Sequence, residues 1–466
     1  MRPIYLILII YLSSIVDIYS DVTAISFESA SDGYTLSEDK SIVTITAEGT
    51  YELTGSQTDK KILVSSSCTL NLKEFSLTNI GTLTPIVISE NKAVELVLPS
   101  DKESMLIDSE TNENDGVIYL QNGASLTISG TGILTLNPKK LLAINGTEGT
   151  SLTVNDGAKI KIISGSSTGG IYLRNSITFN YAEFQYYGEN GAHHAIDSEG
   201  NIKLIKGDYY LKSGNGKGIQ SEKVLDIGKE NGNSNDLTLY IETSNEGIEA
   251  KGINIYLGSI EIIAKEDGIN AASSGNECDE NVQCSGNCDC YINIKGGMLQ
   301  ITSGEDGLDA NGDIFISGGM VLVFASSTGA DQPIDQDGIL KITGGLVAAA
   351  WSSSMGGVNA QTTQIAKIYK GTINSKANIN ITNEIGIEIY SFQAPKEASY
   401  IYFNYETSFK VELNGNEITL SETNQNQQPN NPEKEKGGNP PDKGVEPNFG
   451  YFLRLPNIVF LYGIIL

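Results

Sequence analysis

Arginine, tryptophan and histidine are scarce in this sequence. Its 466 residues include one Trp and two His, and Arg174 is the only arginine between the two hydrophobic ends of the chain. Recognition of an anionic ligand by a bidentate guanidinium group therefore has a single candidate. His193 and His194 are adjacent and lack the spaced third ligand of a catalytic metal site. No P-loop, dinucleotide fingerprint or Gly-x-Ser-x-Gly motif is present, so none of these catalytic frameworks is indicated.

Positive charge is also in short supply. Lys and Arg number 31 against 57 Asp and Glu, which gives a formal net charge of -26 at pH 7. This charge repels phosphate backbones and anionic lipid head groups, so we expect no nucleic-acid partner. Cations are the natural partners of such a chain, and we expect contact with a membrane only through its hydrophobic C-terminal tail.

Long amphipathic helical patterns are missing as well. Fifty Gly and 12 Pro stand among many Asn, Ser and Thr, and the apolar residues are mostly Ile, Leu and Val. This composition is typical of short β-strands joined by tight turns. With 39% hydrophobic residues the chain can bury a substantial core, so we expect it to fold.

Both ends of the chain are hydrophobic. Residues 1–20 contain one positive charge, an apolar run from Ile4 to Val16 and a small residue before the expected cut, which is the pattern of a secretory signal peptide. Residues 449–466 form an apolar tail behind a polar segment, 421–448, which we expect to be a disordered linker. The tail fits a lipid-anchor signal, and a single membrane helix is the alternative. We therefore expect an exported protein, either extracellular or held at the cell surface.

The cysteines fit an oxidising compartment. Four of them crowd one loop, 274–290, and a fifth, Cys68, stands alone. The four are Cys278, Cys284, Cys288 and Cys290. They predict two local disulfides with all three connectivities open, and a four-cysteine zinc site is the alternative. Sequons that begin at Asn145 and Asn380 permit N-glycosylation in a secretory route that performs it.

An internal repeat organises the middle of the chain. Residues 292–310, INIKGGMLQITSGEDGLDA, superpose without a gap on residues 253–271, INIYLGSIEIIAKEDGINA. Two further copies begin at Ile314 and Leu340, and fainter copies occur upstream. Each copy alternates apolar and polar residues, pauses at Gly and alternates again, which predicts two short strands with a bend between them.

A single copy cannot bury its own apolar face. Stacked copies can, if each strand pairs in parallel with its equivalent in the next coil. The repeat therefore predicts an all-β fold, a parallel β-helix (solenoid) over residues 115–364 with the Cys-rich loop as an insertion. Residues 21–114 and 365–420 are strand-rich but off register, and we expect β-rich end caps there.

Acidic turns follow the second strand of the strongest copies, as in Glu266-Asp267-Gly268-Ile269-Asn270. Coils stacked in register would place these side chains in vertical columns about 4.8 Å apart. The first column comprises Glu246, Asp267 and Asp306, and the second comprises Glu249, Asn270, Asp309 and Asp335, with Asp197 as an extension below.

Two carboxylates at that spacing repel each other by about 3.5 kcal/mol at an effective dielectric constant near 20. A bound cation removes this repulsion, and calcium suits best because it accepts 6 to 8 oxygen ligands with loose geometry. The predicted ligands are Glu246, Glu249, Glu266, Asp267, Asn270, Glu305, Asp306, Asp309 and Asp335. In the simpler alternative, Asp-Gly and Glu-Gly only form turns in which Gly takes a positive φ and the acids are solvated.

The I-x-I-x-G-G-x-L/V-x-I strand pair and its E-D-G-I/L-D/N-A turn resemble a family of secreted carbohydrate-binding β-helix proteins. The match covers roughly residues 115–360. The resemblance implies a pectate-lyase-like, right-handed parallel β-helix that binds calcium and holds polysaccharide, with cellulose and acidic glycans as candidate ligands. That family is described as binding rather than cleaving. The cysteine insertion and the hydrophobic tail are departures from it.

The sequence is compatible with three functions. The favoured one is non-catalytic, calcium-dependent polysaccharide binding, in which exposed aromatic rings stack on sugars. The candidate rings are Tyr187, Tyr210, Tyr256 and Trp351. The second is a calcium-dependent, pectate-type lyase with Lys251 or Lys265 as base, although neighbouring acids would raise the pKa of either lysine. The third is an adhesin or structural stalk without a sugar ligand.

Overall fold

The computed structural model describes residues 22–188, 193–233, 236–272, 290–325, 331–354 and 356–423, all within one compact unit, 1–425. The regular elements in this part are β-strands, so the predicted all-β class is confirmed. None of the described residues belongs to a helix long and apolar enough to span a bilayer. The predicted signal peptide, the C-terminal tail and most of the predicted linker and Cys-rich loop lie outside the described residues.

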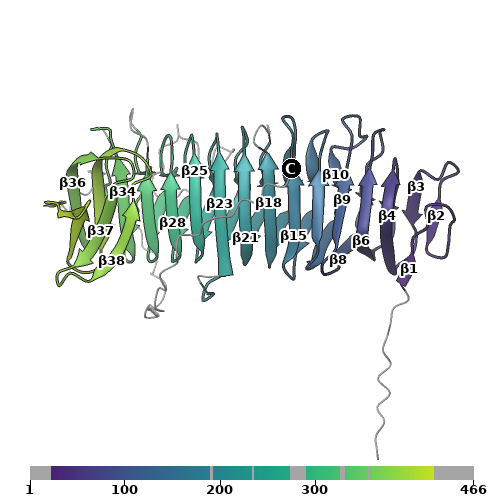
Figure 1. The fold of residues 1–466 in the computed structure, drawn as a ribbon, viewed down its shortest axis with the longest axis horizontal. Coiled ribbons are helices and arrows are strands. Elements are labelled where there is room, and N and C mark those ends of the chain that lie inside the picture. Colours follow the sequence, from purple (N-terminus) through teal and green to yellow (C-terminus); the bar gives the residue numbers. More distant parts are fainter. Residues whose placement is uncertain are drawn as a thin grey trace, which may run out of the picture. The chain divides into compact units, whose positions relative to one another are not determined.

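Successive coils stack through three parallel ladders of strands, which we name faces 1, 2 and 3 in the order in which the chain visits them (Figure 1). Face 1 comprises β3 (Ile42–Ile45), β5 (Lys61–Val64), β7 (Ile86–Ile88), β10 (Gly116–Leu120), β13 (Leu142–Gly146), β16 (Gly169–Leu173), β19 (Ile196–Ser198), the first halves of β22 (Ile219–Ile227) and β24 (Ile248–Ile255), β26 (Ile269–Ala271), β29 (Leu308–Ala310) and β32 (Ile334–Gln336). A short strand, β2 (Tyr34–Leu36), pairs antiparallel with β3.

Face 2 begins with the edge strand β1, which precedes the first strand of face 1, and most of its later strands follow a strand of face 1 along the chain. It comprises β1 (Val22–Ala24), the first halves of β4 (Thr50–Thr58) and β6 (Cys68–Thr78), β8 (Ala93–Leu98), β11 (Ser125–Gly130), β14 (Ser151–Val154), β17 (Ser176–Phe179), β20 (Asn201–Leu204), the second halves of β22 and β24, β27 (Tyr291–Ile294), β30 (Asp313–Ile316), β33 (Leu340–Ile342) and β35 (Gln361–Thr362).

Face 3 completes each coil. It comprises the second halves of β4 and β6, β9 (Glu103–Ile107), β12 (Ile133–Asn137), β15 (Ala158–Ile163), β18 (Ala182–Gly188), β21 (Gly207–Ser213), β23 (Leu237–Thr243), β25 (Ser259–Ala264), β28 (Met298–Thr302), β31 (Met320–Phe324) and β34 (Leu346–Trp351). The molecule is therefore a parallel β-helix, as the repeat predicted.

The predicted register is confirmed residue by residue. Ile255 pairs with Ile294, Ile260 with Leu299 and Asn270 with Asp309. The structure adds a third strand to each predicted pair, because the Gly-Ile-Asn-Ala segment that reads as a turn forms the short strand of face 1. Inward residues of the three faces are buried in one continuous core, for example Ile253, Ile262 and Ile269, each 0% exposed.

The parallel ladders extend upstream of the predicted boundary at Asp115. β5 pairs with β7, β7 with β10, and β8 with β11, all in parallel, so residues 42–114 add coils to the same solenoid. The repeat is hard to recognise there because the turns between face 3 and face 1 are long. Residues 79–85 and 108–115 form two of these turns.

Downstream of residue 364 the pairing becomes antiparallel. β36 (Ile365–Ile373), β39 (Ala398–Tyr405) and β42 (Ser421–Glu422) continue from β34, and a second sheet comprises β38 (Glu388–Gln393), β37 (Asn378–Asn383), β40 (Phe409–Leu413) and β41 (Asn416–Glu417). A second apolar core packs this part against the outer side of face 3, where Leu322, Phe324 and Ala348 are buried. The antiparallel strands occupy the predicted cap region, 365–420, and cover the open strand edge of β34.

Candidate functional site

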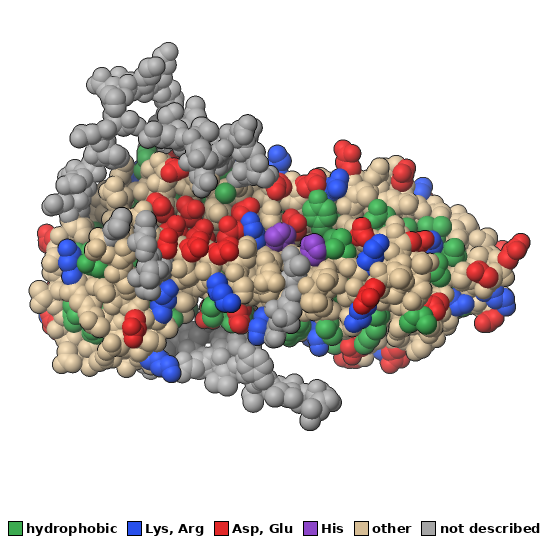
Figure 2. Space-filling view, turned by 90° about the horizontal axis from the view of Figure 1, so that it is seen from above, with side chains coloured by type: hydrophobic (Ala, Val, Ile, Leu, Met, Phe, Trp, Pro, Cys, Tyr) green, Lys and Arg blue, Asp and Glu red, His purple; other side chains and the backbone are tan. Residues whose placement is uncertain are grey.

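The acidic residues predicted from the repeat form the expected second column on the outer side of face 1. Glu249 pairs with Asn270, Asn270 with Asp309 and Asp309 with Asp335 in the register of the parallel strands. The column continues below Glu249 to Asp197, with Gln220 between the two. Figure 2 shows acidic side chains gathered on this side of the molecule.

The first column lies at the corner between face 3 and face 1. The backbone N–H of Gly247 donates to Asp267 O and that of Gly268 to Asp306 O, both at 2.9 Å, so Glu246, Asp267 and Asp306 belong to consecutive coils. The carboxylate of Asp267 also accepts a hydrogen bond from the backbone N–H of Asp306, at 2.8 Å. The two columns together, Glu246, Asp267, Asp306, Glu249, Asn270, Asp309 and Asp335, are called the acidic ladder below.

The glycines of these turns are required for close packing rather than for a positive φ. Gly247, Gly268 and Gly307 are not among the residues with positive φ, which corrects the simpler reading of the Asp-Gly and Glu-Gly pairs. A Cβ added at Gly268 would collide with the core side chain of Ile301 and lie 2.6 Å from the carbonyl oxygen of Gly307. The turn therefore lies directly on the core and on the next coil.

Replacing Gly268 with Ala is expected to lower the free energy of unfolding by about 1–3 kcal/mol, the usual cost of overpacking a rigid core. Urea denaturation of the two proteins measures the loss. Gly357→Ala is the matched control, since nothing lies within 4 Å of a Cβ at that position. Equal stability of the Gly268 and Gly357 variants would contradict the packing explanation.

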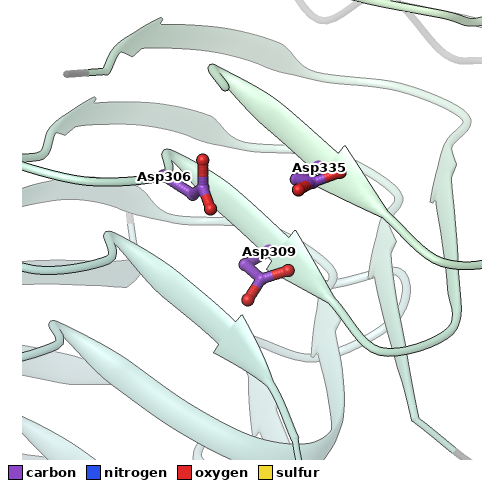
Figure 3. Close-up of side chains that lie close together, drawn as sticks. All are labelled: Asp306, Asp309 and Asp335. Atoms are coloured by element: carbon purple, nitrogen blue, oxygen red, sulfur yellow. The ribbon is translucent and has the colours of Figure 1, made fainter. Parts of the chain in front are cut away.

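Three carboxylates of the acidic ladder converge at its C-terminal end. Oxygen atoms of Asp306, Asp309 and Asp335 all lie within 4.8 Å of one another (Figure 3). Asp306 lies in the turn before β29, Asp309 on β29 and Asp335 on β32, so two adjacent coils build the group. Burial, and then the charges of its neighbours, raise the pKa of Asp309 to about 8. These oxygens have the arrangement of a ligand set for a cation.

One coil earlier, Asp267 and Asn270 occupy the positions equivalent to Asp306 and Asp309. The amide nitrogen of Asn270 donates to Glu246 Oε1 at 3.1 Å, whereas its oxygen is buried and has no hydrogen-bond partner among the described residues. Because the two ends of an amide point apart, this oxygen is turned away from Glu246. Burial raises the pKa of Asp267 to about 7, and the charge of Asp306 adds to the rise. Asp267, Asn270 and Asp309 thus occupy, one coil earlier, the positions that Asp306, Asp309 and Asp335 occupy in the converging group.

Lys217 occupies the N-terminal end of the acidic ladder. Its Nζ lies 2.6 Å from Glu246 Oε2 and also contacts Glu249. Burial disfavours the charged amine, but hydrogen bonds and charge from Glu246 and Glu249 raise the pKa of Lys217. This lysine was not among the residues predicted from the sequence, although Lys217-Gly218-Ile219 aligns with Glu246-Gly247-Ile248 and the pairing of Ile219 with Ile248 confirms the alignment.

The remaining predicted metal ligands, Glu266 and Glu305, precede Asp267 and Asp306 in their turns. Neither belongs to the converging group of three carboxylates, and Glu305 is exposed. Burial raises the pKa of Glu266, with smaller contributions from the charges of Glu246 and Glu305. These two residues therefore border the acidic ladder.

Without a bound cation, the stability of the protein is expected to fall as the pH rises from about 4 to about 8. Burial and neighbouring charge raise the pKa of Asp309 to about 8 and that of Asp267 to about 7, whereas an unfolded Asp titrates near 3.9. Between these values the folded state holds more protons than the unfolded state, so rising pH favours unfolding.

Thermal unfolding in chelator at a series of pH values measures this dependence. Asp309→Asn removes one of the shifted groups and should flatten the slope above pH 5. If the midpoint temperature of unfolding rises equally in the wild type and in Asp309→Asn between pH 5 and pH 8, burial does not destabilise the charged form of these carboxylates.

The predicted sugar-stacking residues do not form one site. Tyr187 and Tyr210 lie together on face 3, with ring centroids 5.4 Å apart, and Tyr240 stacks on Tyr210 at 5.1 Å. The rings of this stack cover part of one another's faces. Tyr256 lies elsewhere, 4.9 Å beneath Lys295 Nζ.

The prediction that Trp351 stacks on a sugar is wrong. Its side chain is 3% exposed, and its ring stacks on Tyr400 at 5.3 Å. The reason is that β39 pairs antiparallel with β34 and places Tyr400 beside Trp351.

The predicted disulfides and glycosylation sites are described only in part. Cys290 is buried before β27, and the other three clustered cysteines lie outside the described residues, so the disulfides stay a prediction. Asn145 lies on β13, where it pairs with Tyr119 of the preceding coil and Tyr172 of the following coil. Asn380 lies in β37 between two other strands and donates to Glu412 at 3.3 Å.

These features define the molecule as a parallel β-helix protein with an acidic ladder at one corner of its coils. A family model described as "carbohydrate-binding domain-containing protein" matches residues 39–275 and 233–391. The chain belongs to this carbohydrate-binding domain-containing family. A solved structure of a polysaccharide lyase-like protein from C. thermocellum, a gadolinium derivative, is 21% identical, with a TM-score of 0.28 over 59% of this chain and 86% of that chain. No curated protein matches the chain.

Proposed function

We propose that this protein is a non-catalytic, calcium-dependent polysaccharide-binding protein that acts outside the cell or at its surface. The observation that carries the proposal is the convergence of Asp306, Asp309 and Asp335, whose oxygens lie within 4.8 Å of one another in a chain of the carbohydrate-binding family. Polysaccharide is the partner that the family indicates, and the acidic ladder supplies the calcium dependence.

Calcium fits the donor set better than other common metals. The group offers carboxylate oxygens from Asp306, Asp309 and Asp335, and an equivalent set comprises Asp267, Asn270 and Asp309. Oxygen donors without imidazole or thiolate disfavour zinc, and side chains from separate coils suit the loose geometry of calcium better than the strict octahedron of magnesium. Glu246 and Glu249 contact Lys217, so we assign them to this internal ion pair instead of to a metal.

The acidic ladder lies at the corner between face 3 and face 1 and on the outer side of face 1. Calcium accepts 6 to 8 oxygens, and three side chains supply only part of that number. Water or the hydroxyl and carboxylate oxygens of a polysaccharide can fill the rest. An acidic glycan would meet repulsion from a chain with net charge -26 unless a cation lies between them. The proposed ion therefore serves as a bridge.

Two basic side chains of the described part of the chain, Lys217 and Arg174, are poorly suited to act as the base of a lyase. Lys217, which lies beside the acids, contacts two carboxylates that raise its pKa. The guanidinium of Arg174 pairs with Glu199 at 3.4 Å. A base for proton abstraction should instead have a pKa near the working pH.

Binding to immobilised polysaccharides, cellulose and pectate among them, tests the proposal when it is measured with calcium and with chelator. We expect retention on at least one polysaccharide with calcium and at least a tenfold loss in chelator or in the Asp309→Asn variant. Equal retention in both buffers would refute calcium dependence, and absence of retention would favour a stalk. A rise in absorbance from unsaturated uronate during incubation with pectate would show a lyase instead.

Export and surface attachment are proposed on the strength of residues 1–20 and 449–466. The test is the amino-terminal sequence of the mature protein together with its release from membranes. An amino terminus at or near Asp21 is expected, and an intact Met1 would contradict export.

A further inference from the structure

We propose that a cavity near the N-terminal end of the solenoid is a second glycan subsite, which binds an uncharged sugar residue without calcium. This inference rests on the proposed polysaccharide-binding function and extends it to a different part of the chain. The cavity lies at the corner between face 3 and face 1, where the turns after β6, β9 and β12 meet.

The size and lining of the cavity suit a sugar ring. Its volume is about 420 Å³, within the range of roughly 300–1,000 Å³ that is usual for small-ligand sites. Apolar surface comes from Ile107 and from Ile80, which is 72% exposed. Hydroxyl groups come from Thr78 and Thr111. A pyranose combines an apolar C–H face with hydroxyls at its edge. The apolar lining can contact that face, and the threonine hydroxyls can hydrogen-bond to the sugar hydroxyls.

The charges at the cavity favour an uncharged sugar. Two acids and one lysine line it. Glu110 and Lys139 are exposed, whereas Asp108 is 1% exposed and its carboxylate accepts hydrogen bonds from Asn112 and from the backbone N–H of Lys139. Glu110 and Lys139 can hydrogen-bond to hydroxyls. A uronate would meet the strongly negative field of the whole chain here without a cluster of converging carboxylates to hold calcium.

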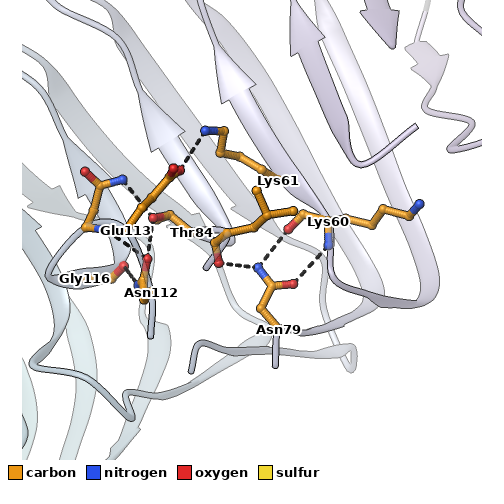
Figure 4. A network of polar contacts seen from close by, with 9 residues as sticks. Lys60, Lys61, Asn79, Thr84, Asn112, Glu113 and Gly116 are labelled. Atoms are coloured by element: carbon orange, nitrogen blue, oxygen red, sulfur yellow. Dashed lines mark hydrogen bonds and ion pairs between the residues drawn. The ribbon is translucent and has the colours of Figure 1, made fainter. Parts of the chain in front are cut away.

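Buried hydrogen bonds hold the turns around the cavity in place (Figure 4). Asn79, 2% exposed, accepts from Lys60 N at 3.0 Å and donates to Lys60 O and Leu83 O at 2.9 and 2.7 Å. Asn112, 1% exposed, donates to Asp108 Oδ2 at 2.8 Å and accepts from Thr84 at 2.6 Å. Such networks fix the shape of a site before a ligand arrives, which lowers the entropic cost of binding.

The cavity lies at the same corner of the coils as the first column of the acidic ladder. The turn of Lys139 follows β12 and that of Asp306, in the proposed calcium group, follows β28, and the ladder β12–β15–β18–β21–β23–β25–β28 separates them by six coil steps. At about 4.8 Å for each step, this is roughly 29 Å. A linear polysaccharide that lies along the corner can therefore reach both places.

Titration calorimetry in chelator tests the subsite with a panel of neutral hexasaccharides: cellohexaose, xylohexaose, mannohexaose and laminarihexaose. We expect the wild-type protein to bind at least one of them and Ile80→Ser to weaken that binding at least fivefold. Ile385→Ser is the matched control, because Ile385 is 81% exposed and lies between β37 and β38, outside the cavity lining. Tetragalacturonate binding with calcium should be the same in Ile80→Ser as in the wild type.

The outcomes separate the two proposals. If no neutral hexasaccharide binds in chelator, or if both isoleucine variants behave alike, the second subsite is wrong even when calcium-dependent binding persists. If neutral binding persists in chelator and requires Ile80 while calcium has no effect on any glycan, the subsite stands and the calcium bridge fails.

Discussion

Calcium at about a hundred times its dissociation constant should raise the free energy of unfolding by about 2.7 kcal/mol for each ion that binds only the folded state. Asp309→Asn should abolish most of this gain, because Asp309 belongs both to the group with Asp306 and Asp335 and to the equivalent group with Asp267 and Asn270. Thermal unfolding with calcium and with chelator measures both effects.

The control for this experiment is Asp208→Asn, which removes an exposed acid on face 3 and should keep the full response to calcium. A calcium response that is equal in the wild type and the Asp309 variant would place the ion elsewhere. No response in the wild type would remove calcium from the proposed function.

Lys217→Met is expected to lower the free energy of unfolding by about 3 kcal/mol in chelator at pH 8, because it leaves two carboxylates without their cation. The estimate takes the lower end of the range for a broken buried pair, since the side chains of Lys217, Glu246 and Glu249 are still 17, 14 and 17% exposed. Calcium should restore more stability to this variant than it adds to the wild type. The position left by the Lys217 ammonium would border the column of Glu246, Asp267 and Asp306, which consists of acids alone. Urea denaturation measures both quantities.

The matched control is Lys203→Met. Lys203 lies 3.9 Å from Asp226 on face 2, and its side chain is 48% exposed against 17% for Lys217; surface pairs contribute about 0–1 kcal/mol. If the Lys217 and Lys203 variants lose the same stability, the ammonium of Lys217 does not neutralise the ladder. If calcium fails to rescue the Lys217 variant, Glu246 and Glu249 are not arranged to hold a metal.

Much of the fold could be predicted because the repeat carries its own register. Ile294 over Ile255 and Asp309 over Asn270 follow from a gapless superposition of two segments, and parallel pairing converts that alignment into contact. The upstream coils escaped prediction because the long turns at residues 79–85 and 108–115 obscure the period. The burial of Trp351 was not predicted either, because it depends on an antiparallel partner, Tyr400, that belongs to no repeat.

The sequence by itself determined that the chain forms stacked coils and that acids distant along it share a column, because period and alternation dictate which residues of successive coils face the same way. Only the tertiary structure decided which of those acids contact a lysine of the chain and which of them approach one another. Lys217 reaches Glu246 and Glu249, while Asp306, Asp309 and Asp335 approach one another. These distances depend on side-chain conformations and on the neighbouring coil. The sequence pattern of a single strand contains neither.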